Sequence, residues 1–271
     1  MMDALCEITK LVCNIAALYP LQSSEFSTSC RPILQILSAV EIPSPPLQPP
    51  VSSLINCLVF IVPDLSIDYE EAHITHLVRI LDQATQAYPA DQLDRSCSPL
   101  AQLLLLISQS APARIKALLQ TLLLPTATDR ERVLGTDDSL PSRLLRISTS
   151  LTAGQLRVLI PRLLFELSNK DEERFVRNIG YGYASGFLYS MGNTNSAADG
   201  STAQRRTEGR SDQRSIGDGN AVTTAGDVNP LTGQRRDHEI QPDLPEMTEE
   251  EKEREAERLF VLFERCVSQV S

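Results

Sequence analysis

Apolar side chains recur every three or four residues from the start of the chain to about residue 192, the spacing that places them on one face of an α-helix. One long stripe comprises Ile74, Leu77, Val78, Leu81, Ala84 and Tyr88. A second comprises Leu156, Leu159, Ile160, Leu163, Leu164 and Leu167. Alternating β-branched runs and Asn-Gly hairpin turns are absent, so the pattern predicts an all-α chain.

Prolines and polar breaks divide this region into short helices, because a proline cannot continue a helix. Residues 125–141 are predicted to form a long loop. Short turns between helices with wide apolar faces favour an armadillo/HEAT-like α-solenoid, with a compact helical bundle as the alternative. The predicted helices cover residues 4–18, 32–40, 51–62, about 74–88, 100–108, 113–124, 141–150, 153–167 and 171–179, with a last one ending near Met191.

The composition changes abruptly after Gly192. Residues 193–247 are rich in Gly, Ser, Thr, Asn, Asp and Arg and carry few apolar side chains, which predicts a disordered linker. Residues 248–271 then form an amphipathic helix that begins with a capping box of Thr248 and Glu251. Its apolar stripe must be buried against residues 1–192, which form the predicted helical-repeat domain, or against a partner.

Charge and hydropathy exclude several classes of protein. The net charge of −10 argues against a nucleic acid partner and against docking on an anionic membrane. No apolar run approaches the length of about 18 residues that a membrane span needs. With an acidic start in place of a signal peptide, this predicts a cytoplasmic protein. The six cysteines include no CxxC pair, so we expect reduced, mostly buried thiols.

A glycine-rich stretch, NIGYGYASGF at residues 178–187, is as dense in glycine as a phosphate-binding loop. Its spacing is GxGxxxG rather than GxGxxG, no strand precedes it, and no GxxxxGK[ST] motif occurs in the chain. We therefore expect no nucleotide cofactor here. The stretch is predicted to be a corner between helices, where Gly180 and Gly182 adopt positive φ and Gly186 permits close helix packing.

Candidate residues for catalysis or metal binding are sparse. His73 and His76 lie three residues apart, but no third ligand is evident, so we expect both on an exposed helix face and no metal site. No nucleophile lies in a recognisable catalytic motif, and we predict no bond-making active site. Arg174, Arg177 and Tyr181 beside the glycine corner are of types enriched at protein interfaces, although they could equally form a solvated helix face.

Three motifs carry a resemblance to the synembryn family. LLFELSNKDEERFVRNIGYGYASGFL, at residues 163–188, resembles the family's "LFxL" helix and "GYGxAxGxL" corner. VNPLTG, at residues 228–233, is similar to its "INPxTG" element, and MTEEEKEREAERLFVLFERC from Met247 resembles its terminal helix. The motifs occur in the family's order, and DSLPSRLLR at residues 138–146 is similar to fungal members.

The resemblance implies a guanine nucleotide exchange factor and folding chaperone for the α subunits (Gα) of heterotrimeric G proteins. It implies an armadillo/HEAT-like solenoid that holds the C-terminal helix of Gα on its concave surface, followed by a mobile tail. The factor would act by stabilising nucleotide-free Gα, and any recruitment to a membrane would be peripheral, through Gα. Family members are longer, so part of the N-terminal solenoid is expected to be missing from this chain.

Seven residues are candidates for contact with Gα. Arg174, Arg177, Tyr181 and Tyr183 would shape a binding surface at the corner, and Leu259, Phe260 and Phe263 would clamp either Gα or the solenoid. The alternative function is a non-catalytic α-solenoid scaffold that binds a helical peptide of a partner. A nucleotide-binding enzyme would bind GTP or NAD by itself, which we do not expect.

Overall fold

The computed structural model of the chain describes residues 2–19, 26, 28–61, 69–198, 228–239, 251–258 and 260. Within these residues every regular element is a helix. The β-type hydrogen bonding among them is limited to an isolated antiparallel bridge between Val228 and Arg235. The all-α prediction is therefore confirmed for this part of the chain. The chain divides into two units, Met1–His238 and Glu239–Ser271.

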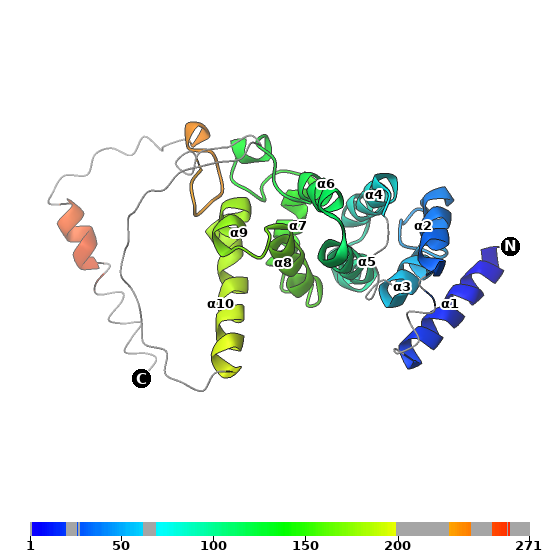
Figure 1. The fold of residues 1–271 in the computed structure, drawn as a ribbon. Coiled ribbons are helices and arrows are strands. Elements are labelled where there is room, and N and C mark those ends of the chain that lie inside the picture. Colours follow the sequence, from blue (N-terminus) through cyan, green and yellow to red (C-terminus); the bar gives the residue numbers. More distant parts are fainter. Residues whose placement is uncertain are drawn as a thin grey trace. The chain divides into compact units, whose positions relative to one another are not determined.

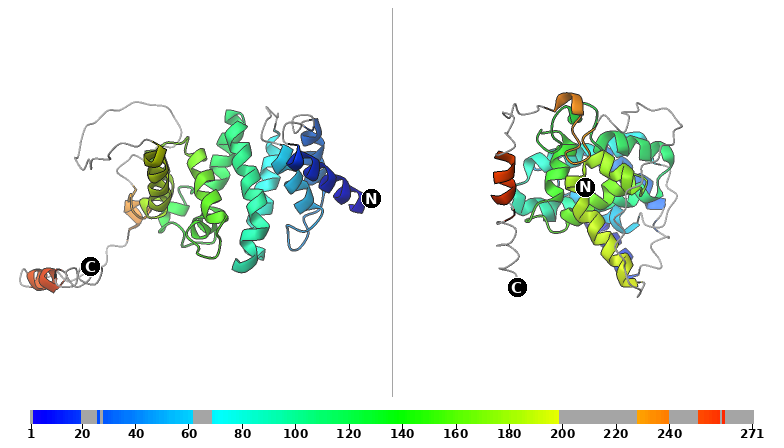
Figure 2. Two further views of the ribbon diagram at one scale, coloured as in Figure 1. Left: turned by 90° about the horizontal axis from the view of Figure 1, so that it is seen from below. Right: turned by 90° about the vertical axis from the view of Figure 1, so that its left-hand side faces the viewer.

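The helices of the first unit stack in two layers (Figures 1 and 2). In one layer α1, α3, α5 and α8 pack side by side, and in the other α4 lies between α2 and the pair α6 and α7. This stacking is consistent with an α-solenoid. The helices are α1 Met2–Leu18, α2 Cys30–Ala39, α3 Val51–Ile61, α4 Glu71–Ala87, α5 Ala90–Ser110, α6 Ala113–Leu123, α7 Leu140–Ser148, α8 Leu156–Leu167, α9 Glu172–Ile179 and α10 Tyr181–Ala198.

The apolar stripes seen in the sequence form one continuous core. The first stripe has six members, five on α4 and the sixth, Tyr88, directly after it. All six are buried. On α8 the stripe is buried except for Leu159, which is half-buried. Burial at helical spacing on both helices agrees with the predicted pattern, and it supplies the main driving force that holds the layers together.

Helix α5 begins ten residues earlier than predicted, at Ala90 instead of Leu100. The predicted start was wrong, since the helix continues on both sides of Pro99, which lies inside it. An interior proline costs about 3 kcal/mol in a helix. Here Leu93, Cys97 and Leu100 are buried on either side of it, so packing outweighs this cost.

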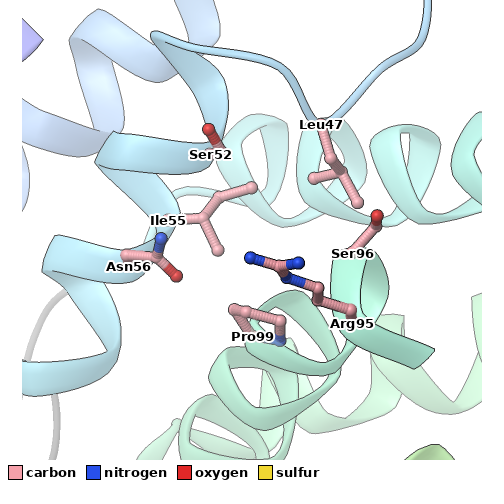
Figure 3. A pocket seen from close by; sticks show the side chains of 7 residues that line it. All are labelled: Leu47, Ser52, Ile55, Asn56, Arg95, Ser96 and Pro99. Carbon is pink, nitrogen blue, oxygen red and sulfur yellow. The ribbon is translucent and has the colours of Figure 1, made fainter. Parts of the chain in front are cut away.

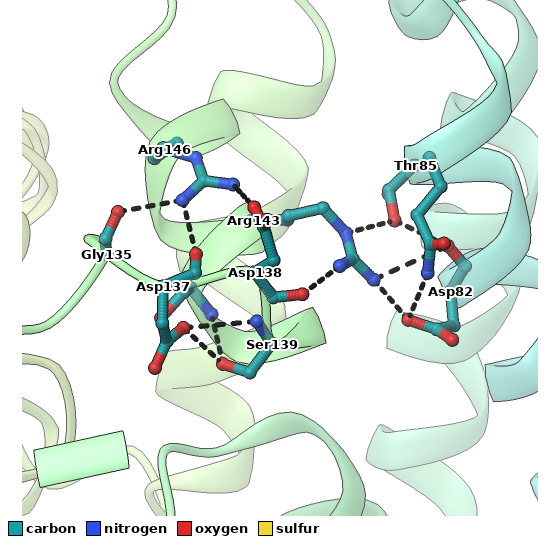
Figure 4. A network of polar contacts seen from close by, with 10 residues as sticks. Asp82, Thr85, Gly135, Asp137, Asp138, Ser139, Arg143 and Arg146 are labelled. Atoms are coloured by element: carbon teal, nitrogen blue, oxygen red, sulfur yellow. Dashed lines mark hydrogen bonds and ion pairs between the residues drawn. The ribbon is translucent and has the colours of Figure 1, made fainter.

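Polar side chains tie the predicted loop at 125–141 to the helices (Figure 4). Arg143 on α7 donates to the hydroxyl of Thr85 at 3.0 Å and pairs with the carboxylate of Asp82, both on α4. Arg146 donates to the carbonyl of Gly135 at 2.9 Å. Arg143 also donates to the carbonyl of Asp138 in the loop. The loop is therefore fixed to α7 by both arginines, and it contains a short 3₁₀ helix, Asp129–Glu131.

Three phenylalanines join the last helices of the first unit. Phe165 of α8, Phe175 of α9 and Phe187 of α10 form a cluster with ring centroids 5.3 to 5.6 Å apart. The rings meet edge-on or tilted, the arrangements that aromatic quadrupoles favour. The cluster fixes the angle at which α10 leaves the solenoid.

The histidines of α4 are buried, with His73 6% and His76 8% exposed, so the predicted exposed helix face was wrong. The helix turns both side chains inward because they flank the apolar stripe at Ile74 and Leu77. Burial, Arg79 and His73 lower the pKa of His76, although the backbone of Leu37 raises it. In the described part of the chain, no group of three or more potential ligands is placed to hold a metal ion.

The thiols of the described residues are free. Cys30, Cys57 and Cys97 are buried, whereas Cys6 and Cys13 are half-buried. Burial raises the pKa of Cys30 to about 11 and that of Cys97 to about 12, so both stay protonated near pH 7. Cys266 lies outside the described residues. None of the helices that the structure describes is long and apolar enough to cross a membrane.

Removing the central ring of the aromatic cluster should destabilise the first unit. For Phe175→Ala we expect a loss of about 3–5 kcal/mol in the free energy of unfolding, because a fully buried ring leaves a cavity. Phe60→Ala is the matched control, since Phe60 is 43% exposed, and it should cost about 1 kcal/mol. Chemical denaturation measures both values, and equal losses would contradict the packing described.

Stability should also depend on protonation of His76. Its folded pKa is lowered, so the unfolded chain binds a proton more readily, and stability falls as the pH drops below the unfolded value of about 6.5. The loss levels off below the folded pKa. We expect His76→Leu to lose less stability than the wild type between pH 7 and pH 5 in thermal unfolding. Parallel curves would show that His76 is not responsible.

Candidate functional site

Residues 228–239 form a turn that packs where α9 meets α10 (orange in Figure 1). The side-chain oxygen of Asn229 accepts from the backbone N–H of Leu231 at 2.8 Å, as in an Asx-turn. The backbone N–H of Gly233 donates to the carbonyl of Asn229 at 2.9 Å, which closes the turn. We call this segment the 228–239 turn.

The turn caps the start of α10. The backbone N–H of Tyr181 donates to the carbonyl of Pro230 at 2.7 Å, and that of Gly182 to the carbonyl of Leu231 at 3.1 Å. The first N–H groups of a helix have no acceptor within it. Two sequence motifs separated by about forty residues therefore meet through main-chain hydrogen bonds.

Gly180 is required at this junction for two reasons. Its φ is +79°, a conformation that other residues rarely adopt. A Cβ atom there would also lie 3.1 Å from both the Gly233 nitrogen and the Leu231 oxygen of the turn. The predicted positive φ is thus confirmed for Gly180. It was wrong for Gly182, which lies inside α10, and Gly186 has no neighbour within 4 Å of an added Cβ, so its predicted close packing was also wrong.

A buried arginine holds the turn from the other side. Arg130, only 7% exposed, donates to the carbonyl of Gly233 at 3.1 Å and to that of Asn178 at 2.8 Å. Its own carbonyl accepts from the N–H of Arg235 at 2.8 Å. Burial lowers the pKa of this guanidinium, while Asp129 raises it. Arg130 thereby joins the loop after α6, the end of α9 and the turn.

Leu134 forms the remaining wall of the surface on which the turn packs, which we call the seat. Its N–H donates to the carbonyl of Thr232 at 3.4 Å, and its carbonyl accepts from the hydroxyl of Tyr183 at 3.3 Å. Its side chain packs so tightly on Gly233 that a Cβ there would lie 2.3 Å from Leu134 Cδ1. Gly233 also has a φ of +70°. The turn is therefore fitted to this seat by shape as well as by hydrogen bonds.

The structure brings four of the predicted contact residues to this corner. Arg174 and Arg177 are exposed on α9, and Tyr181 is 52% exposed at the start of α10. Tyr183 is half-buried, with its hydroxyl committed to Leu134. The corner thus exposes two guanidinium groups and one tyrosine ring to solvent.

The three predicted clamp residues belong to the second unit. Residues 251–258 are helical, and Phe260 is 64% exposed. Leu259 and Phe263 lie outside the residues whose side chains the structure describes. The clamp role of these residues stays a prediction.

The sequence pointed to neither Arg130 nor the fold of residues 228–239. That turn lies inside the predicted disordered linker, 193–247, and the prediction was wrong for these residues. The physical reason is that Asn229 closes a local turn and Arg130 supplies a buried donor to it, which together offset the entropy of ordering. The signal that could have indicated order was the VNPLTG motif itself. Helix α10 likewise passes the predicted boundary at residue 192.

Apart from the corner, a small cavity lies between α3 and α5 (Figure 3). It has a volume of about 180 Å³, well below that of a typical ligand pocket. The guanidinium of Arg95 points into it, beside the side chain of Asn56. This space suits water or a single carboxylate rather than a nucleotide. Its lining is Leu47, Ser52, Ile55, Asn56, Arg95, Ser96 and Pro99.

The groups gathered at the corner suit binding more than proton transfer. They are main-chain amides and carbonyls, the Tyr183 hydroxyl and the guanidinium of Arg130, which stays protonated in proteins. Such groups hold and orient a peptide backbone. What they hold here is the chain's own turn.

Replacing Gly180 should release the turn. For Gly180→Ala we expect faster amide hydrogen exchange at Tyr181 and Gly182 and a loss of about 1–3 kcal/mol in stability, from the strained φ and the clash with the turn. Gly186→Ala is the control. It should raise stability by up to about 1 kcal/mol, because alanine favours a helix interior and meets no neighbour. Unchanged exchange in Gly180→Ala would argue against the seat.

Comparison with known proteins places the chain in a family. The family model for the guanine nucleotide exchange factor synembryn matches residues 1–269. A synembryn-like chaperone of Schizosaccharomyces pombe is 32% identical over 168 residues, 60% of this chain and 30% of that protein. The chaperone Ric-8A of Macaca fascicularis is 32% identical over 155 residues, which cover 57% of this chain and 27% of the relative.

Ric-8A of Xenopus tropicalis is 28% identical over 202 residues, 74% of this chain and 34% of the relative. The matched part of the chain thus spans about a third of the length of these curated relatives. No solved structure matches the chain. Because the family model covers nearly every residue, the chain belongs to the family of the guanine nucleotide exchange factor synembryn.

Proposed function

We propose that this chain binds α subunits of heterotrimeric G proteins and acts as their exchange factor and folding chaperone. The observation that carries the proposal is the family match over residues 1–269. The matched relatives from yeast and vertebrates are chaperones, which supports the same role.

Exchange would proceed through differential binding rather than through bond-making chemistry. A protein that binds nucleotide-free Gα more tightly than the GDP-bound form shifts the equilibrium toward GDP release. It also protects the empty, less stable form, which is the work of a chaperone. A stack of helices with a continuous buried core provides a stiff surface for this purpose.

The exposed side chains of the α9–α10 corner form one part of the proposed Gα surface. Arg174, Arg177 and Tyr181 combine contact area with directional hydrogen bonds. Tyr183 supports them from below through its bond to Leu134. The C-terminal helix, with Phe260 exposed, forms the second part. The net charge of −10 would steer basic segments of Gα toward the chain.

The second candidate is a scaffold that binds a helical segment of a partner without promoting exchange. The observation that favours it is the coverage, since the matched part spans only about a third of each relative. Both candidates place the protein in the cytoplasm, and neither requires a cofactor.

GDP release from a purified Gα subunit distinguishes the two functions. We expect release to accelerate when the chain is added at micromolar concentration, because binding favours the empty form. Fluorescent or radiolabelled GDP provides the measurement. Binding to Gα without faster GDP release would support the scaffold function instead. Absence of binding would contradict both proposed functions.

A charge-reversal pair tests the corner in the same assay. Arg174→Glu with Arg177→Glu should weaken Gα binding about tenfold or more, since two exposed guanidinium groups that would donate hydrogen bonds to Gα are lost. The matched control reverses Arg157 and Arg162, which are exposed on α8, and should leave the affinity nearly unchanged. If both double variants lost the same affinity for Gα, the change in net charge would explain the loss, and a local binding surface at the corner would be contradicted.

A further inference from the structure

Arg95 on α5 is a cation whose charge no neighbouring carboxylate neutralises. Its guanidinium points into the cavity between α3 and α5 (Figure 3), and within the described part of the chain it makes no ion pair. Asp94 accepts from the backbone N–H groups of Gln155 and Leu156 at 2.8 to 3.2 Å and so caps α8. Asp91 lies one helical turn before Arg95, a spacing that favours an ion pair, yet the guanidinium turns toward the cavity.

The cavity itself favours a negatively charged ligand. Guanidinium, hydroxyl and amide groups can all donate hydrogen bonds, and the lining supplies each of them. Ser52 also lies in the first turn of α3, where the helix dipole favours negative charge. The polar members of the lining are Ser52, Asn56, Arg95 and Ser96, the other members are Leu47, Ile55 and Pro99, and none is acidic.

The proline inside α5 coincides with this cavity. Pro99 has no N–H, so it cannot donate to the carbonyl of Arg95, which lies four residues earlier in the helix. Its ring also conflicts with that carbonyl in a regular helix. Arg95 and Pro99 both line the cavity, so the local departure from regular helix packing occurs where the guanidinium points inward.

We propose that Arg95 anchors an acidic side chain, Asp or Glu, of a partner protein in the cavity between α3 and α5. The inference rests on the proposed function only in naming Gα as that partner. A guanidinium holds a carboxylate through two parallel hydrogen bonds. The volume of about 180 Å³ admits a carboxylate with its methylene groups, which would lie against Ile55 and Pro99. It is too small for a drug-sized ligand.

A side chain of a bound protein fits this site better than a free small acid does. Arg95 is exposed, and a single exposed ion pair contributes little binding free energy, so a free acid held by it alone binds weakly. A side chain on a protein that also contacts other surfaces is held in place by the rest of the interface. The bound partner then excludes water from the cavity, which strengthens the hydrogen bonds to the carboxylate.

An NMR titration of the full chain tests the cavity without Gα. The chain carries isotope-labelled arginine, and the Nε–H signal of Arg95 is identified by its loss in Arg95→Gln. Millimolar N-acetylglutamate N-methylamide should shift this signal to saturation at constant ionic strength, whereas the neutral glutamine analogue should not. Arg162, exposed on α8, is the internal reference for general charge effects. Equal shifts at both arginines, or a response to inorganic phosphate but not to the glutamate probe, would overturn the proposal.

Binding to Gα tests the partner. Arg95→Gln should weaken the affinity of the full chain for Gα about fivefold, because the acidic side chain loses its charged donor. Arg95→Lys should restore part of this loss, since an ammonium keeps the charge but not the fork. Arg162→Gln is the matched control and should leave the affinity unchanged. All three variants should keep the wild-type melting temperature, because both arginines are exposed.

The outcomes separate this inference from the proposed function. An unchanged affinity in Arg95→Gln, or an equal loss in Arg162→Gln, would contradict Gα as the partner that fills the cavity. If the wild type itself does not bind Gα, the proposed function fails. The titration with the glutamate probe then decides by itself whether the cavity holds a carboxylate.

Discussion

The N–H groups at the start of α10 need acceptors outside their own helix, and the structure around them follows from that need. The acceptors are carbonyls of the 228–239 turn, which reaches them only because Gly180 lets the turn's backbone approach within van der Waals distance. The same approach places the turn against Leu134 and Arg130. One unsatisfied helix end thereby determines where a distant part of the chain is attached.

A buried guanidinium makes this attachment specific. Carbonyl groups from two segments converge on Arg130, and its burial makes the hydrogen bonds strong and the loss of any one expensive. The loop after α6 is itself fixed to α4 and α7 by Arg143 and Arg146. The turn is thus attached to the rigid part of the first unit.

This arrangement lets the α9–α10 corner hold the turn without using the side chains that are proposed to contact Gα. Main-chain groups of Tyr181 and Gly182 hold the turn, while the side chains of Arg174, Arg177 and Tyr181 remain exposed. The proposed Gα surface and the attachment of the tail can therefore exist together. The phenylalanine cluster beneath, through Phe175, keeps α9 and α10 in the orientation that this arrangement needs.

The sequence by itself determined where most of the helices lie, because apolar spacing reports directly on which face of a helix is buried, as on α4 and α8. It also determined the family, through three local motifs in order. Only the tertiary structure decided that the glycine corner and the VNPLTG element meet, that His76 and Arg130 are buried, and that Pro99 lies within a helix. These features depend on contacts between residues far apart in the chain, and neither local propensity nor periodicity carries information about such contacts.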